Sequence, residues 1–155
     1  MIVLSDLVFL LAPPVLGLGV PALSGAQYKK DSCKMYTSPL QPPGWVFGVG
    51  WLILYLLYGI AFFLAWRQSK RRMTPALWVS AALFVGLVTW SVVFFRFCAP
   101  ELAFASIMAL LGLAFAMALL FARENKMWSA ILSVPLVLWM CFASYLSFET
   151  TKPFL

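Results

Sequence analysis

Hydrophobic residues fall in five long runs along the chain, and short polar, basic or proline-containing stretches separate these runs. Each run has about the 20 apolar residues that a helix needs to cross a lipid bilayer. The pattern therefore predicts membrane-spanning helices over about 2–23, 44–66, 75–97, 101–122 and 128–148.

Prolines and basic residues mark where these runs begin and end. Pro43 and Pro75 stand at the starts of the second and third runs, where the first helical turn needs no backbone NH. The first run lacks a basic leading segment, so we interpret it as a retained span and not as a signal peptide. Prolines also lie inside it, where they imply kinks: Pro13, Pro14 and Pro21.

Composition supports a membrane domain. Of the 155 residues, 64% are hydrophobic and 10% charged, and the mean hydropathy is +0.96. Soluble domains are nearer one half apolar and one quarter charged, so a soluble enzyme, a nucleic-acid-binding module and a disordered chain are all poor interpretations. We expect an all-α integral membrane protein, a five-transmembrane-helix bundle in which residues 1–155 form a single membrane domain.

The net charge of +6 comes from basic residues in the loops, which indicates contact with the lipid bilayer and no nucleic acid partner. The side carrying the second and fourth loops has six Lys or Arg, and the other side has five. This balance favours a cytoplasmic N-terminus and a cytoplasmic loop 67–74, if the protein is bacterial. The six are Arg67, Lys70, Arg71, Arg72, Arg123 and Lys126; the five are Lys29, Lys30, Lys34, Arg96 and Lys152.

Several kinds of chemistry lack their usual residues. There is no histidine, and Cys33, Cys98 and Cys141 lie far apart without a paired spacing, so no metal site and no required cofactor are predicted. Acidic residues occur only toward predicted span ends, which leaves no visible proton relay. Serines in the spans have no activating base, so no catalytic residue is predicted.

Aromatic residues, in contrast, form stripes at helical spacing. The stripes lie on the second, third and fifth spans and could together line one flat apolar pocket for a planar ligand, with Tyr55 or Ser144 as orienting polar groups. Ordinary helix packing explains the same stripes, and both interpretations stay open. The stripes are Phe47, Trp51, Tyr55, Tyr58 and Phe62; Leu87, Trp90, Phe94 and Phe97; and Leu132, Pro135, Trp139 and Phe142.

Small residues align on two predicted helices and allow close approach of another helix, within the protein or from a second copy. They make a homodimer plausible. They are Ala105, Ala109, Gly112 and Ala116 in the fourth span, and Ala82 with Gly86 in the third.

Three segments resemble the translocator protein family, whose bacterial members are called tryptophan-rich sensory proteins and whose animal members are called the peripheral-type benzodiazepine receptor. The resemblance covers nearly the whole chain, including the five-span layout. The segments are Pro42-Pro43-Gly44-Trp45-Val46-Phe47 with Trp51, Leu54-Tyr55 and Gly59; Trp90-Ser91-Val92-Val93-Phe94-Phe95; and Pro135, Trp139, Phe142-Ala143 and Leu146.

This resemblance implies a five-helix bundle, often dimeric, that binds porphyrins such as protoporphyrin IX. It also implies binding of isoquinoline and benzodiazepine ligands and, in animal members, cholesterol. Loop 24–43 would act as a lid. Trp51 and Trp139 match the positions that face the tetrapyrrole, and the remaining expected ligand-binding residues are Tyr55, Trp90, Phe94, Phe47, Phe142 and Ala143.

The chain departs from the family pattern at a few positions. Leu40 stands where the lid usually has tryptophan, and Leu87 and Ser147 stand where asparagine is common. The sterol motif, a weak pattern in any case, is not met, because Phe148 occupies the usual tyrosine position. We therefore expect altered ligand preference and no sterol binding through that motif.

The function expected from the residues and the resemblance is a membrane receptor or sensor of tetrapyrroles, acting in tetrapyrrole homeostasis or stress signalling. The alternatives are a light- or oxygen-dependent porphyrin-degrading enzyme, a transporter of tetrapyrrole or lipid, and a structural membrane subunit. We expect a multi-pass protein of the bacterial inner membrane, or of the mitochondrial outer membrane if eukaryotic.

Overall fold

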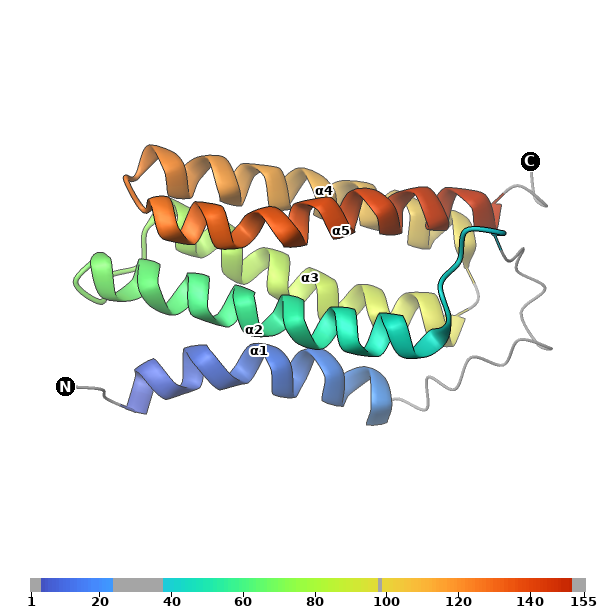
Figure 1. The fold of residues 1–155 in the computed structure, drawn as a ribbon, viewed down its shortest axis with the longest axis horizontal. Helices are drawn as coiled ribbons and strands as arrows, with labels where there is room; N and C mark the ends of the chain where they lie inside the picture. The colour runs from blue at the N-terminus through green and yellow to red at the C-terminus, as the bar shows by residue number, and fades with distance from the viewer. Residues whose placement is uncertain (1–3, 24–37, 98, 152–155) are drawn as a thin grey trace.

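The computed structural model describes residues 4–23, 38–97 and 99–151, and within them it contains five helices (Figure 1). These are α1 (Leu4–Leu23), α2 (Gly44–Gln68), α3 (Pro75–Phe97), α4 (Pro100–Arg123) and α5 (Met127–Thr151). No strand occurs in the described residues. The all-helical prediction is confirmed.

Four of the helices, α2 to α5, are long and apolar enough to cross a membrane. Within α1 the described residues cover the apolar stretch Asp6–Val20, and by length and composition the structure supports four of the five predicted spans. α5 continues to Thr151, beyond the predicted end at 148. In this added turn the Thr150 hydroxyl donates to Ser147 O at 2.6 Å, and the Thr151 hydroxyl donates to Phe148 O at 2.7 Å.

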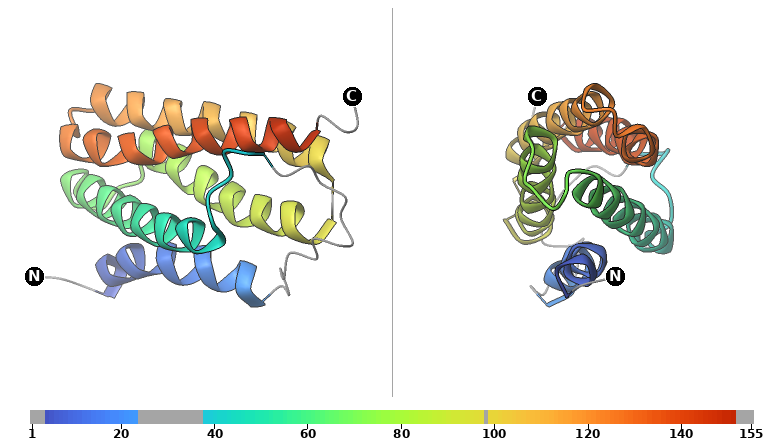
Figure 2. Two further views of the ribbon diagram at one scale, coloured as in Figure 1. Left: turned by 45° about the vertical axis from the view of Figure 1, so that its right-hand side comes forward. Right: turned by 90° about the vertical axis from the view of Figure 1, so that its left-hand side faces the viewer.

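The helices form a ring. α1 contacts α2 and α3, α2 also contacts α5, and α4 lies between α3 and α5. The end-on view in Figure 2 shows this arrangement. One end of the ring carries the start of α1 and the connections 69–74 and 124–126, while α2 begins and α5 ends at the opposite end (Figure 1). We call this opposite end the cavity end.

Large apolar side chains cover much of the outer surface of the ring. A soluble monomer rarely exposes so continuous an apolar surface, whereas lipid tails cover it at no cost. Trp78 and Trp128, which are 64% and 73% exposed, lie in the first turns of α3 and α5, where interfacial tryptophans are expected. Exposed apolar residues include Leu52, Ile53, Leu56, Val85, Leu102, Leu119 and Leu138.

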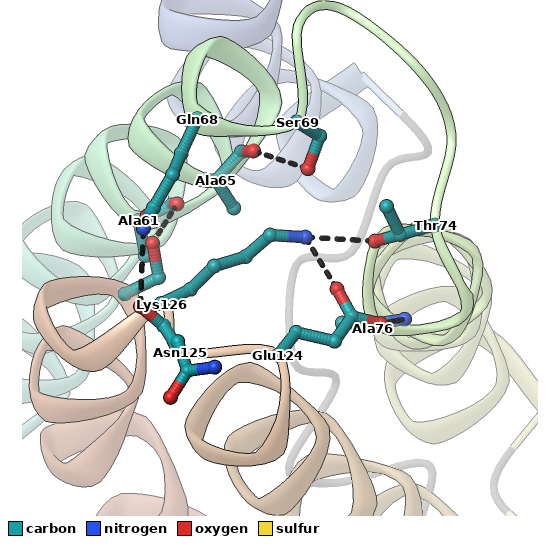
Figure 3. A network of polar contacts seen from close by, with 10 residues as sticks. Ala61, Ala65, Gln68, Ser69, Thr74, Ala76, Glu124, Asn125 and Lys126 are labelled. Atoms are coloured by element: carbon teal, nitrogen blue, oxygen red, sulfur yellow. Dashed lines mark hydrogen bonds and ion pairs between the residues drawn. The ribbon is translucent and has the colours of Figure 1, made fainter.

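A polar network ties the helices together at the end opposite the cavity end (Figure 3). Lys126, which is 4% exposed, donates through Nζ to the Glu124 carboxylate and to Thr74 Oγ1, the latter at 2.9 Å. Glu124 Oε1 accepts from the Ala76 amide at 3.0 Å, so a carboxylate caps the first turn of α3. The network therefore joins the end of α4 to the start of α3.

The protonation of Glu124 is coupled to this network. Burial raises the pKa of the Glu124 carboxyl, but hydrogen bonds from Lys126, Thr74 and the Ala76 amide outweigh burial, and the net pKa is lowered. The carboxylate form is thus the form that the folded protein stabilises.

An ion pair attaches α1 to the same end of the ring. Asp6 is 1% exposed, and its Oδ2 lies 3.0 Å from Arg71 Nη2 and 3.7 Å from Arg67 Nη1. The hydrogen bond to Asp6 raises the pKa of the Arg71 guanidinium. Asp6 was predicted near a span end, and the structure shows that it joins α1 to the end of α2.

Candidate ligand-binding site

A cavity of about 400 Å³ lies between α1, α2, α3 and α5 at the cavity end of the ring. Its volume falls in the range of about 300–1,000 Å³ that is typical of small-molecule sites. None of its lining side chains is charged, and few are polar. The lining residues are Gly17, Leu18, Gly44, Phe47, Gly48, Trp51, Tyr55, Trp90, Ser91, Phe94, Trp139, Ala143, Leu146, Ser147 and Thr150.

The structure brings seven of the eight predicted ligand-binding residues to this cavity. They come from three helices that are far apart in the sequence: Phe47, Trp51, Tyr55, Trp90, Phe94, Trp139 and Ala143. The aromatic stripe of α2 divides, because its later members Tyr58 and Phe62 are buried in the core, 5% exposed each, and do not line the cavity.

Phe142 is the one predicted residue that lies elsewhere. Its ring contacts the ring of Trp139, with centroids 5.9 Å apart, and it lines a shallow groove on the outer side of α2 and α5. The cavity instead receives Trp139, Ala143, Leu146 and Ser147 of α5. Residues at i, i+4, i+7 and i+8 share one helical face, and Phe142 at i+3 lies on the other side of Trp139.

The tryptophans on α2 and α5 form a continuous aromatic wall. The ring centroids of Trp51 and Trp139 are 6.2 Å apart, with the ring planes at 79°. Trp51 stacks on Tyr55 at 5.4 Å, and Phe47 meets the Trp139 ring edge to face at 5.8 Å. Because the two indoles touch each other, a planar ligand would lie against this wall and not in a slot between two parallel indoles.

Trp90 is held from behind by α4. It stacks on Phe94, with centroids 5.1 Å apart, and its Nε1 donates to Ala103 O at 3.0 Å. The hydrogen bond fixes the orientation of the indole, and α4 thus supports the cavity although it contributes no lining residue.

Two glycines give the aromatic rings their space. A Cβ added at Gly17 of α1 would lie 2.5 Å from the Tyr55 ring, and one at Gly50 would lie 3.0 Å from the Trp139 ring. Sequence reasoning missed Gly17 and its neighbour Leu18, because an isolated glycine in an apolar run does not reveal which aromatic ring packs on it.

The polar lining atoms differ in whether they already have partners. The hydroxyls of Ser91 and Thr150 donate to carbonyl oxygens of their own helices, Leu87 O at 3.0 Å and Ser147 O at 2.6 Å. Ser147 Oγ and Trp139 Nε1 have no hydrogen-bond partner within the described part of the chain. Ser144, predicted as an orienting polar group, is buried but does not line the cavity.

The described residues contain no group of three or more histidine, cysteine or acidic side chains able to hold a metal ion. Most of the predicted lid falls at 24–37, outside the described residues. The arrangement is suited to noncovalent binding of an apolar, aromatic molecule. Aromatic side chains surround an uncharged space, and a few polar atoms of the lining have no hydrogen-bond partner in the described part of the chain.

A sequence profile of the TspO/MBR family matches residues 9–152. The chain belongs to the TspO/MBR family. The match includes every residue that lines the cavity, from Gly17 to Thr150. Together with the four long apolar helices, membership of the TspO/MBR family identifies the chain as an integral, multi-pass membrane protein.

Individual relatives agree with this assignment. The chain is 32% identical over 110 residues to the tryptophan-rich protein TspO of Archaeoglobus fulgidus, covering 69% of each chain. It is 29% identical over 137 residues to the tryptophan-rich sensory protein of Cereibacter sphaeroides, covering 86% of this chain and 84% of the relative. It is also 28% identical over 115 residues to translocator protein 2 of Canis lupus familiaris, covering 72% and 66%.

Proposed function

We propose that the protein is a membrane receptor that binds porphyrin-type tetrapyrroles, with protoporphyrin IX as the representative ligand, and acts as a sensor in tetrapyrrole homeostasis or stress signalling. The observation that carries the proposal is the uncharged cavity with its aromatic wall, which gathers Trp51, Tyr55 and Trp139 at one end of the ring. The name tryptophan-rich sensory protein, borne by one relative, agrees with this role.

The geometry of the wall favours a flat ligand. A planar macrocycle gains offset stacking and edge contacts when it lies against the indoles of Trp51 and Trp139. The uncharged lining favours an apolar ring system, because an unpaired charge would be costly there. Polar substituents of the ligand would therefore lie toward the cavity end, where water and lipid headgroups can solvate them.

We include α1 in the proposed membrane bundle as its fifth span. Gly17 and Leu18 of α1 line the cavity, so the ligand site is incomplete without this helix. Its contact with Tyr55 also gives a route for signalling, because a bound ligand that moves the Tyr55 ring would press on Gly17. A bacterial inner membrane fits the basic connections at the opposite end.

A homodimer is also part of the proposal. On α4 the small residues Ala105, Ala109 and Gly112 are exposed, so a second copy can approach the helix closely. Gly86 of α3, in contrast, packs against Leu110 of the same chain, because a Cβ added there would lie 2.3 Å from the Leu110 side chain. Ala109→Leu is expected to weaken dimerisation measured by light scattering in detergent.

The binding proposal is tested by titrating protoporphyrin IX into the purified protein in lipid nanodiscs and following tryptophan fluorescence. The informative variant is Trp51→Phe with Trp139→Phe. The matched control is Trp78→Phe with Trp128→Phe, which also removes two tryptophans but removes exposed ones outside the cavity. The midpoint of saturable quenching should shift to higher protoporphyrin IX concentration in the first double variant and stay unchanged in the second.

The binding midpoint, and not the amplitude of quenching, decides the test, because both double variants lose fluorophores. Each stacked aromatic pair is worth about 0.5–1.5 kcal/mol beyond its buried area, so replacing both indoles should weaken binding roughly tenfold. Wild-type quenching no greater than that of empty nanodiscs would contradict the proposed function.

A further inference from the structure

The hydroxyl of Ser147 is a buried polar group that faces the cavity without a partner. Ser147 is 3% exposed, lines the cavity, and its Oγ has no hydrogen-bond partner within the described part of the chain. A serine in a helix commonly donates to the carbonyl four residues earlier, as Ser91 does to Leu87 O at 3.0 Å. Leaving a buried hydroxyl unsatisfied is unfavourable, so a partner in the cavity would stabilise it.

The other serine and threonine hydroxyls of the lining already have partners. The Ser91 and Thr150 hydroxyls donate hydrogen bonds to carbonyl oxygens of their own helices. Ser144 resembles Ser147 in being buried, unpartnered and on α5, but it does not line the cavity. Ser147 is therefore a lining residue whose hydroxyl proton is available to a ligand, and it lies nearer the cavity end than the lining donors Tyr55 and Trp139, which are further inside α2 and α5.

Ser147 lies nearer the cavity end of α5 than Trp139 does. Trp139 lies at the middle of α5, and Ser147 lies two turns further on, one turn before Thr151, the last residue of α5. On α2, Trp51 lies about two turns inside the helix start at Gly44. Trp51 and Trp139 thus lie further from the cavity end than the Ser147 hydroxyl does.

We infer that Ser147 donates a hydrogen bond to a carboxyl or carbonyl oxygen at the polar edge of the ligand and thereby fixes its orientation. This inference rests on the proposed function. The apolar macrocycle lies inward against Trp51 and Trp139, and the acceptor-bearing edge points to the cavity end. Ser147 is thus a specificity-determining residue that favours amphipathic porphyrins over porphyrins without an acceptor side chain.

The test compares two porphyrins in lipid nanodiscs. Protoporphyrin IX carries propionate side chains, and octaethylporphyrin has a similar macrocycle with ethyl groups only. Ser147→Ala should weaken binding of protoporphyrin IX about tenfold, because a hydrogen bond to a charged acceptor is lost. The same substitution should leave octaethylporphyrin binding unchanged. Ser144→Ala, the matched control, should leave both affinities unchanged.

The outcomes separate this inference from the proposed function. Wild-type binding of protoporphyrin IX that Ser147→Ala does not weaken would overturn the role of Ser147 alone. Equal weakening of both porphyrins would also overturn it, since that result indicates a change of cavity shape. If the wild-type protein binds neither porphyrin, the proposed function fails and this inference fails with it.

Discussion

Gly59 lies where α2 packs closely on the backbone of α1. A Cβ added to Gly59 would lie 2.7 Å from Leu10 O and 3.4 Å from Phe9 O, both of which are backbone atoms of α1. Backbone oxygens cannot turn aside as a flexible side chain can, so the two helices must separate to admit a methyl group. Gly59→Ala is therefore expected to destabilise the packing of α1 on α2.

Two opposing terms set the size of the effect. Alanine is better than glycine inside a helix by about 1 kcal/mol. Overpacking costs about 1–3 kcal/mol, and a rigid neighbour places Gly59 at the upper end of that range. The net loss should be about 2 kcal/mol, which corresponds to a fall in Tm of roughly 4–8 °C for a chain of this size.

Gly48→Ala is the matched control. Gly48 is also on α2, but a Cβ added there meets no atom of the described residues within 4 Å. Only the gain in helix propensity remains, so Tm should hold or rise. Both proteins would be heated in the same detergent with tryptophan fluorescence as the readout. Equal Tm values for the two variants would refute the close α1–α2 packing.

Three further predictions concern the two ion pairs and the outer groove beside Phe142. Stability should fall as the pH drops below about 4.5, because the folded state lowers the pKa of Glu124 and protonation weakens its bond with Lys126. Glu124→Gln should lower the free energy of unfolding at pH 7 by about 1–3 kcal/mol and flatten this acid response in thermal unfolding. Arg71→Met should lower Tm more than Asp6→Asn, because it removes the nearer cation from a carboxylate that is 1% exposed. After Asp6→Asn the Arg71 side chain, which is 41% exposed, stays solvated, so equal losses of Tm in the two variants would contradict this expectation. Phe142→Ala should leave protoporphyrin IX affinity within about twofold in the fluorescence titration, because Phe142 lines the outer groove; a loss as large as that of the Trp51 and Trp139 variant would place the ligand outside the cavity.

The sequence allowed most of the fold to be predicted, because long apolar runs with proline and basic boundaries are a direct consequence of bilayer thickness. The ends of α2 to α5 fall close to the predicted boundaries. The extension of α5 to Thr151 was missed, since threonines score as polar while their hydroxyls satisfy carbonyls of the same helix. The burial of Asp6 could not be predicted, because it depends on arginines far along the chain.

The aromatic lining was also readable from helical spacing, but its limits were not. Spacing places Phe142 and Ala143 near Trp139, and only the packing of α2 against α5 decides that Ala143 faces inward and Phe142 outward. The contribution of α1 was invisible for the same reason, because Gly17 carries no side chain to signal a contact. Local geometry also decides whether a serine hydroxyl donates to its own helix. Ser91 donates to Leu87 O, whereas Ser147 has no partner in the described part of the chain.

The proposed function requires that a tetrapyrrole binds inside the ring of helices, against the wall formed by Trp51 and Trp139. The most direct measurement is an experimental structure of the protein in lipid with protoporphyrin IX bound. We expect macrocycle density between α1, α2, α3 and α5, with the propionate edge near Ser147. Density confined to the outer groove beside Phe142, or an empty cavity at saturating porphyrin, would contradict it.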